Sequence, residues 1–170
     1  MIIRRALALS LLALLVAPVA AGAQSITCPP GTTRGGTESE AGKFHWCEQT
    51  SPGGPIRQGP MVGFHPNGRR SFELNFVDGS PRGSVRAWYE GGQPSMTGET
   101  RPDNGTLVLW DEGGRKRAQI DVRDRQVVTR AWTEEGREER YEEAKLAKAM
   151  PTNRNLGFLM QLWAVGIGIQ

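Results

Sequence analysis

The chain has 170 residues, of which 38% are hydrophobic and 23% charged, so it is long enough for one domain or a short repeat array. Its 21 Lys and Arg residues are interleaved with 18 Asp and Glu residues, giving a formal net charge of +3. Because there is no continuous basic stripe, we expect no nucleic-acid binding. With only two Cys and two His, the chain has few residues for a metal centre.

The first 23 residues have the pattern of a secretory signal peptide. Arg4 and Arg5 precede an apolar run over 6–16, which is too short to span a bilayer, and small residues at 21–23 precede the expected cleavage site. A membrane anchor is the alternative interpretation. We therefore expect an exported protein, in the periplasm, the cell envelope or the extracellular space. Removing 1–23 removes two Arg and no acidic residue, which lowers the formal net charge to +1.

Both cysteines, Cys28 and Cys47, lie in the segment 24–58, which is rich in Pro and Gly turns. In an oxidising compartment they should form a disulfide. Closing that loop stabilises the fold by about 3 kcal/mol in the chain-entropy model. The alternative is a metal site that adds His45, although one His between two Cys is a weak ligand pattern. We predict an irregular, disulfide-stapled N-terminal cap.

The segment 59–137 carries an internal repeat. An aromatic residue recurs at spacings of 24, 22 and 22 residues, and glycine follows it after two or three turn residues. The repeat aromatics are Phe64, Trp88, Trp110 and Trp132, and the turn glycines are Gly68, Gly91, Gly92, Gly113, Gly114 and Gly136. Four occurrences in register indicate a repeat protein.

Turn signals lie at both ends of every expected strand. Asn67-Gly68 is typical of a two-residue type I′ hairpin turn, and Gly91-Gly92 and Gly113-Gly114 meet the same requirement for positive φ. The opposite ends carry Asp78-Gly79, Asp103-Asn104-Gly105 and Asp124-Arg125. Apolar and polar residues alternate between these turns. The sequence therefore predicts a mainly β protein, an elongated antiparallel meander of hairpin repeats with a short C-terminal α-helix.

The repeat aromatics should form a row across this sheet. Equivalent positions on every second strand lie about 10 Å apart. We favour the row as the core of the sheet, since a single layer has little else to bury and Trp buries a large area. The alternative is that the row is a binding platform.

The array resembles the variant MORN repeats of YwqK-family antitoxin-like bacterial proteins. Their pattern is Gly, four variable residues, an aromatic, two residues, then Asn or Gly followed by Gly. Three units match from Gly59, Gly83 and Gly105, whereas the fourth departs at Val127 and Glu135. The resemblance implies an elongated antiparallel sheet of hairpins and carries no function over. MORN repeats elsewhere are associated with membrane attachment and protein scaffolding.

The composition changes after the array. Strong helix formers fill 138–150, with acidic residues early and Lys late, so we predict a short helix that Pro151 ends. An apolar C-terminal tail over 151–170 follows, and 156–170 carries no charge. We expect this part to form a buried strand pair or to cover the sheet. The alternative is a tail that contacts the membrane or binds a partner as a strand.

Motifs for catalysis are absent from the sequence, which has no nucleophile elbow, phosphate loop or zinc-binding His pair. Acidic residues recur at the turns, but turns favour them for local hydrogen bonding as well as for Ca²⁺. We expect no enzyme activity, metal or cofactor. The favoured hypothesis is an exported interaction or scaffold module with a protein partner in the cell envelope. The alternatives are lipid association through 156–170, or an antitoxin-like or immunity role implied by the family resemblance.

Overall fold

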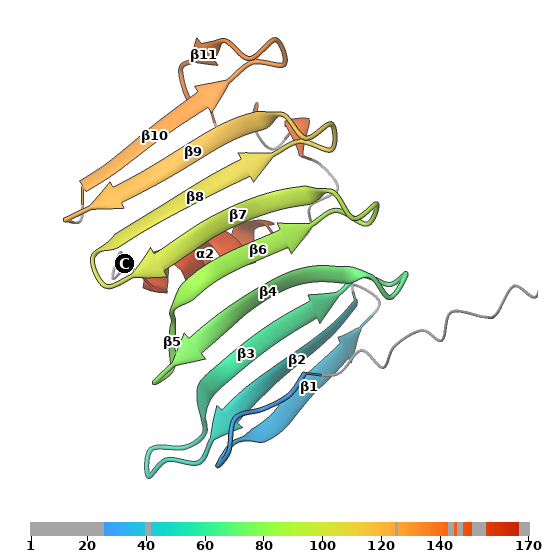
Figure 1. The fold of residues 1–170 in the computed structure, drawn as a ribbon, viewed down its shortest axis with the longest axis vertical. Helices are drawn as coiled ribbons and strands as arrows, with labels where there is room; N and C mark the ends of the chain where they lie inside the picture. The colour runs from blue at the N-terminus through green and yellow to red at the C-terminus, as the bar shows by residue number, and fades with distance from the viewer. Residues whose placement is uncertain are drawn as a thin grey trace, which may run out of the picture.

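The structure is a computed structural model that describes residues 26–39, 42–124, 126–142, 145, 148–150 and 156–166. The described strands form a single open antiparallel sheet, and one helix, α2 (Leu156–Gly166), packs against one face of it (Figure 1). The prediction of a mainly β antiparallel meander is confirmed. The predicted signal peptide lies outside the described residues.

Strands adjacent in sequence are also adjacent in the sheet, in the order β1-β2-β3-β4-β6-β7-β8-β9-β10-β11, while the short β5 pairs with β4 beside this path. The strands are β1 (Thr33–Ser39), β2 (Gly42–Gln49), β3 (Ile56–Phe64), β4 (Arg70–Val77), β5 (Ser80–Pro81), β6 (Gly83–Trp88), β7 (Pro94–Arg101), β8 (Asn104–Trp110), β9 (Lys116–Arg123), β10 (Gln126–Trp132) and β11 (Glu138–Glu139).

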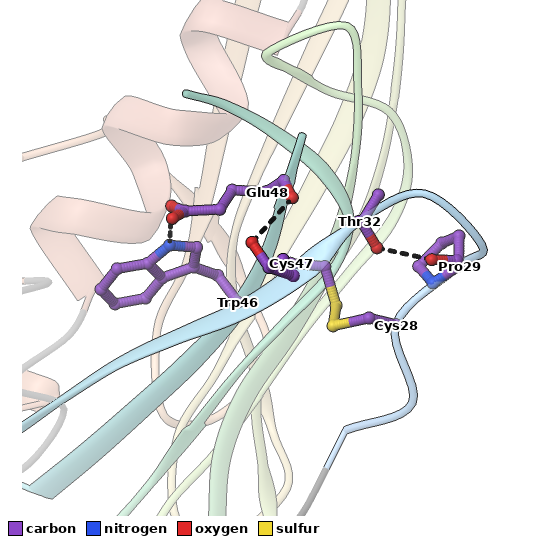
Figure 2. The surroundings of a disulfide bond; sticks show 7 residues. Cys28, Pro29, Thr32, Trp46, Cys47 and Glu48 are labelled. Carbon is purple, nitrogen blue, oxygen red and sulfur yellow. Dashed lines mark hydrogen bonds between the residues drawn. A yellow bond between two sulfur atoms is a disulfide. The ribbon is translucent and has the colours of Figure 1, made fainter. Parts of the chain in front are cut away.

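The N-terminal segment is more regular than predicted. β1 and β2 form a hairpin, and β2 pairs with β3, so the expected irregular cap is part of the sheet. β1 was missed because it contains no large apolar residue that would reveal alternation. The predicted disulfide is present: Cys28, ahead of β1, bonds to Cys47 in β2 with a Cα–Cα distance of 5.5 Å (Figure 2).

The hairpin turns at the repeat glycines are not type I′. In the first unit the amide of Gly68 donates to the carbonyl of His65 (2.8 Å), and the amide of His65 donates to the carbonyl of Arg69 (2.8 Å). The same pair of bonds recurs in the other three units. Positive φ occurs only at the last loop residue, namely Gly68, Gly92, Gly114 and Gly136, and not at Asn67, Gly91 or Gly113. Each loop is therefore a tight turn closed by one left-handed glycine.

Turns are present at the opposite ends, although the second is Pro102-Asp103, with Asn104 and Gly105 already paired in β8, and Arg125 of the third lies outside the described residues. Each contains an Asp with positive φ, at Asp78 (49°), Asp103 (59°) and Asp124 (49°). Asp tolerates this conformation because its short side chain can hydrogen-bond locally. Asp78-Gly79 joins the paired residues Val77 and Ser80, and both of its residues have positive φ as a type I′ turn demands.

Residues 156–166 of the apolar tail cover the sheet as a helix, so for this part the expectation that it covers the sheet is confirmed and the strand-pair interpretation is wrong. Leu159 and Trp163 of α2 are buried in the core cluster. The indole of Trp163 donates to the carbonyl of Glu99 (3.0 Å), and a guanidinium nitrogen of Arg82 donates to the carbonyl of Gly166. Burial against the sheet outweighs the low helix propensity of glycine at 157 and 166. Among the described residues, no helix combines the length and apolar character needed to cross a bilayer.

The helix predicted over 138–150 is only partly described. Its first residues, Glu138 and Glu139, pair with Trp132 and Ala131 as β11 instead of being helical. Arg140, Tyr141 and Glu142 are not helical either, so the prediction is wrong over 138–142. Lys145, Lys148 and Ala149 are helical, and positions 143, 144, 146 and 147 lie outside the described residues.

Candidate binding surface on the open face of the sheet

The two faces of the sheet differ in what covers them. The face under α2 carries the main apolar cluster, with buried residues such as Ala87 on β6 and Leu109 on β8. We call this the covered face. We call the opposite face the open face. Its residues alternate with core positions along the strands or pair with residues that do so; they include Glu73, Arg86, Trp88, Thr97, Val108, Trp110, Lys116, Gln119, Asp121, Arg130 and Trp132. In Figure 1, α2 lies behind β6 and β7, and the open face is toward the viewer.

Three of the four repeat aromatics are partly exposed on the open face. Trp88 follows the buried Ala87 and Trp110 follows the buried Leu109, so each indole points away from α2, and Trp132 follows the buried Ala131 in the same way. All three Trp are partly exposed. The prediction that the aromatic row forms the core is therefore wrong for them. 

Phe64, the first member of the row, is buried, and its ring centroid lies 5.8 Å from that of His45 on β2.

Each repeat aromatic pairs directly across its own hairpin. The partners are Arg70 for Phe64, Pro94 for Trp88, Lys116 for Trp110 and Glu138 for Trp132. Aromatic and non-aromatic residues thus alternate from strand to strand along this line of the open face. A hollow beside Trp88 is lined by Arg69, Arg70, Glu73 and Gly92.

Polar contacts hold two of these indoles. The indole nitrogen of Trp110 donates to the hydroxyl oxygen of Thr97 (3.0 Å). The ammonium of Lys116 lies 3.8 Å from the centroid of the Trp132 ring and donates to the side-chain carbonyl of Gln119 (3.1 Å). A cation at this distance interacts favourably with the face of an indole. These contacts orient the row before any partner binds.

Carboxylates on the open face are held by arginines. Glu73 bridges Arg70 and Arg86, the latter at 3.3 Å. Asp121 accepts hydrogen bonds from Arg130 (2.9 Å), Gln119 (2.7 Å) and Thr106 (3.0 Å). Burial alone would raise the pKa of Asp121, but these donors and the charge of Arg130 outweigh it and hold the pKa below its ordinary value. The open face therefore presents fixed charges of both signs.

In the first two repeats the residue after the aromatic links one repeat to the next, which the sequence does not predict. His65 hydrogen-bonds through Nε2 to the carbonyl of Trp88 (2.9 Å), and the hydroxyl of Tyr89 donates to the carbonyl of Trp110 (2.8 Å). Burial, with the nearby charges of Glu112 and Asp111, raises the pKa of Tyr89, so the hydroxyl keeps its proton. The detectable signal was a polar or hydroxyl-bearing residue after each aromatic.

The third repeat makes this link through a different residue. Asp111 cannot donate when ionised, and Arg117 donates from Nε to the carbonyl of Trp132 instead (3.0 Å). Asp111 accepts from the amide (3.0 Å) and the guanidinium (2.9 Å) of Arg115. Burial opposes ionisation of Asp111, but these bonds and the positive charge prevail and lower its pKa.

The structure gives no support to the metal alternative at Cys28, His45 and Cys47, since both sulfurs belong to the disulfide. Among the described residues, no group of three His, Cys, Asp or Glu side chains converges as metal ligands would. Comparisons with protein-family models, with curated proteins and with solved structures found no match.

Proposed function

We propose that this chain is an exported, non-catalytic repeat protein that binds a protein partner through the open face of its MORN-like sheet. The observation that carries the proposal is the row of three partly exposed tryptophans at equivalent positions on the open face. Trp and Arg are the residue types that most often dominate the energy of protein–protein binding. Here Arg86 and Arg130 lie on the same face as the tryptophans.

The restrained side chains and the mixed polarity of this face support the same proposal. Contacts from Thr97 and Lys116 already restrain the indoles, so binding would cost little additional side-chain entropy. The mixture of aromatic, cationic and anionic groups suits a folded protein surface with a polar rim. Export is supported by the signal-peptide pattern of 1–23, and the disulfide is compatible with an oxidising compartment.

Lipid contact through the tail receives less support. Leu159 and Trp163, two of the largest apolar side chains of α2, are buried against the sheet. Inserting them into a bilayer would require the helix to leave the core cluster. An antitoxin-like role rests on the resemblance alone.

Site-specific photo-cross-linking in cells that produce the protein tests the proposal. A photo-reactive amino acid replaces Arg86, which is exposed on the open face, or Phe158, which is exposed on α2. We expect a discrete protein adduct from position 86 and none of the same mass from position 158. Equal adducts from both positions, or none from position 86, would contradict binding through the open face.

A further inference from the structure

Most of the outer edge of β10 has no pairing strand among the described residues. β10 pairs with β9 from Gln126 to Ala131, but on its other side β11 pairs only with Ala131 and Trp132. Among the described residues, no strand pairs with the outer edge over 126–130. Figure 1 shows β11 beside only the far end of β10. The outward backbone groups of this stretch therefore form a template for another strand.

The side chains on this edge are apolar on both faces. Val127 is 52% exposed and Val128 is 55% exposed, the largest values among the large hydrophobic residues that the structure describes. Successive strand residues point to opposite faces, so neither side of the edge is polar at its centre. Edges that must stay unpaired usually carry Lys, Pro or a bulge, and none of these is found over 126–129.

The opposite edge of the sheet provides a contrast. β1 has glycine at 35 and 36 and also carries the exposed Arg34 and Glu38. Glycine and charged residues make a strand a poor template for pairing. The two outer edges are therefore not equivalent, because only the β10 edge presents apolar β-branched side chains.

The fourth repeat departs from the sequence pattern of the other three at this same edge strand. Val127 stands where the first three units have Gly59, Gly83 and Gly105. Those three glycines lie in strands with a partner on each side. The β-branched replacement thus coincides with the one repeat strand whose outer side is open among the described residues.

We propose that the edge of β10 pairs antiparallel with β10 of a second copy of this chain, across a two-fold axis at Val128. This register places Val128 opposite Val128 of the second copy and Val127 opposite Thr129. β-Branched cross-strand pairs stabilise antiparallel sheets. A two-fold axis normal to the sheet produces antiparallel pairing of identical strands.

The charges on the edge are compatible with this register. Arg130 lies opposite Gln126 of the second copy, so the two Arg130 residues are offset by four positions, or about 14 Å along the strand. That exceeds the Debye length of about 8 Å at physiological ionic strength. Arg130 is also ion-paired with Asp121 of its own chain at 2.9 Å. The strand is thus self-complementary, which favours a second copy over an unrelated strand as the occupant.

The arrangement has a consequence for binding. Because the axis is normal to the sheet, both open faces point to the same side, and both α2 helices lie on the other. A multivalent partner would then meet two tryptophan rows at once, which raises avidity without a new contact.

The test is sedimentation equilibrium of the purified protein across the micromolar range, where a small strand-to-strand interface should associate. We expect a monomer–dimer equilibrium. Val128→Lys places two ammonium groups against each other across the axis and should raise the dimer dissociation constant at least tenfold. Val77→Lys is the matched control, since Val77 is 41% exposed on β4, away from this edge, and should leave the constant unchanged. Circular dichroism verifies that both variants fold.

A thiol tests the register. The two native cysteines are paired, so Val128→Cys would supply the only free thiol. Mild oxidation should then give a covalent dimer, whereas Val77→Cys should give none. A monomer at every concentration, a dimer that Val128→Lys does not weaken, or equal cross-linking from both cysteine variants would overturn the proposal.

Discussion

The covered and open faces of the sheet are made from the same strands but have different physical tasks. On β8, Leu109 is buried within the apolar cluster, while Val108, one residue earlier, is partly exposed among polar neighbours. The covered face holds α2 and supplies most of the burial. The open face holds its indoles and carboxylates by hydrogen bonds and ion pairs, which contribute less to stability. Stability and recognition are therefore separable by face.

The largest expected loss of stability comes from a substitution on the covered face. Trp163→Ala removes a buried indole that also donates to the carbonyl of Glu99. We expect the free energy of unfolding to fall by about 3–5 kcal/mol, as for other large-to-small core changes. Gln161→Ala on the exposed side of α2 is the control, and chemical denaturation is the measurement. If Trp163→Ala were as mild as Gln161→Ala, the docking of α2 would contribute nothing to the fold.

Removing the disulfide should give the next largest loss of stability. Ile26 and Thr27, just ahead of Cys28, line a hollow with Val62 and Glu73, so the tether holds the N-terminal segment across part of the open face. Replacing both cysteines with Ser should lower the free energy of unfolding by about 3 kcal/mol through the entropy of the unfolded chain. Chemical denaturation of this variant and of the oxidised protein measures the difference. Equal stabilities would show that the tether does not stabilise the fold.

Removing one hydroxyl from each face compares how much the two faces contribute to stability. Tyr89→Phe leaves the carbonyl of Trp110 without the buried donor that links two repeats, so we expect a loss of about 1–2 kcal/mol. Thr97→Val removes an acceptor of the Trp110 indole on the open face, where water can replace it. Its expected loss is below about 0.5 kcal/mol. Thermal unfolding of both variants measures the two losses, and a larger loss for Thr97→Val would contradict the assignment of the faces.

Acid should weaken the fold through Asp111 and Asp121. Their pKa values are lowered in the folded state, so the unfolded chain binds more protons at mildly acidic pH. The stabilisation is complete above the ordinary pKa of about 4 and is lost as the pH falls through the lowered values. Asp111→Asn should be less stable at neutral pH and lose less on acidification. Denaturation at a series of pH values checks this, and parallel curves would rule out Asp111 as a contributor.

The sequence predicts the repeat from spacing, the antiparallel order from turn residues and alternation, and the disulfide from two cysteines in a chain expected to be exported. It does not predict which face the tryptophans occupy. Ala87, Trp88 and Tyr89 are all apolar or aromatic, so alternation gives no direction there. Beside Trp88 and Trp110 the partner strands β7 and β9 each carry an extra residue, Ser95 and Arg117, which interrupts the period of two in those strands.

The remaining differences have similar physical causes. The residues of β1 are small and polar, and they form a strand because β2 provides a template. The tail is helical because the sheet offers an apolar face to cover, a tertiary effect that overrides glycine propensity. The link from Tyr89 to Trp110 depends on the contact between two repeats, which one repeat alone cannot reveal.

The most direct test compares Val108→Arg with Leu109→Ala, two neighbours on opposite faces of β8, each combined with the photo-reactive residue at position 86. We predict that Leu109→Ala lowers the free energy of unfolding by about 2–5 kcal/mol. We also predict that Val108→Arg changes it by less than about 1 kcal/mol and abolishes the partner adduct. A Val108→Arg variant that keeps the adduct, or loses as much stability as Leu109→Ala, would contradict the separation of stability and recognition between the two faces.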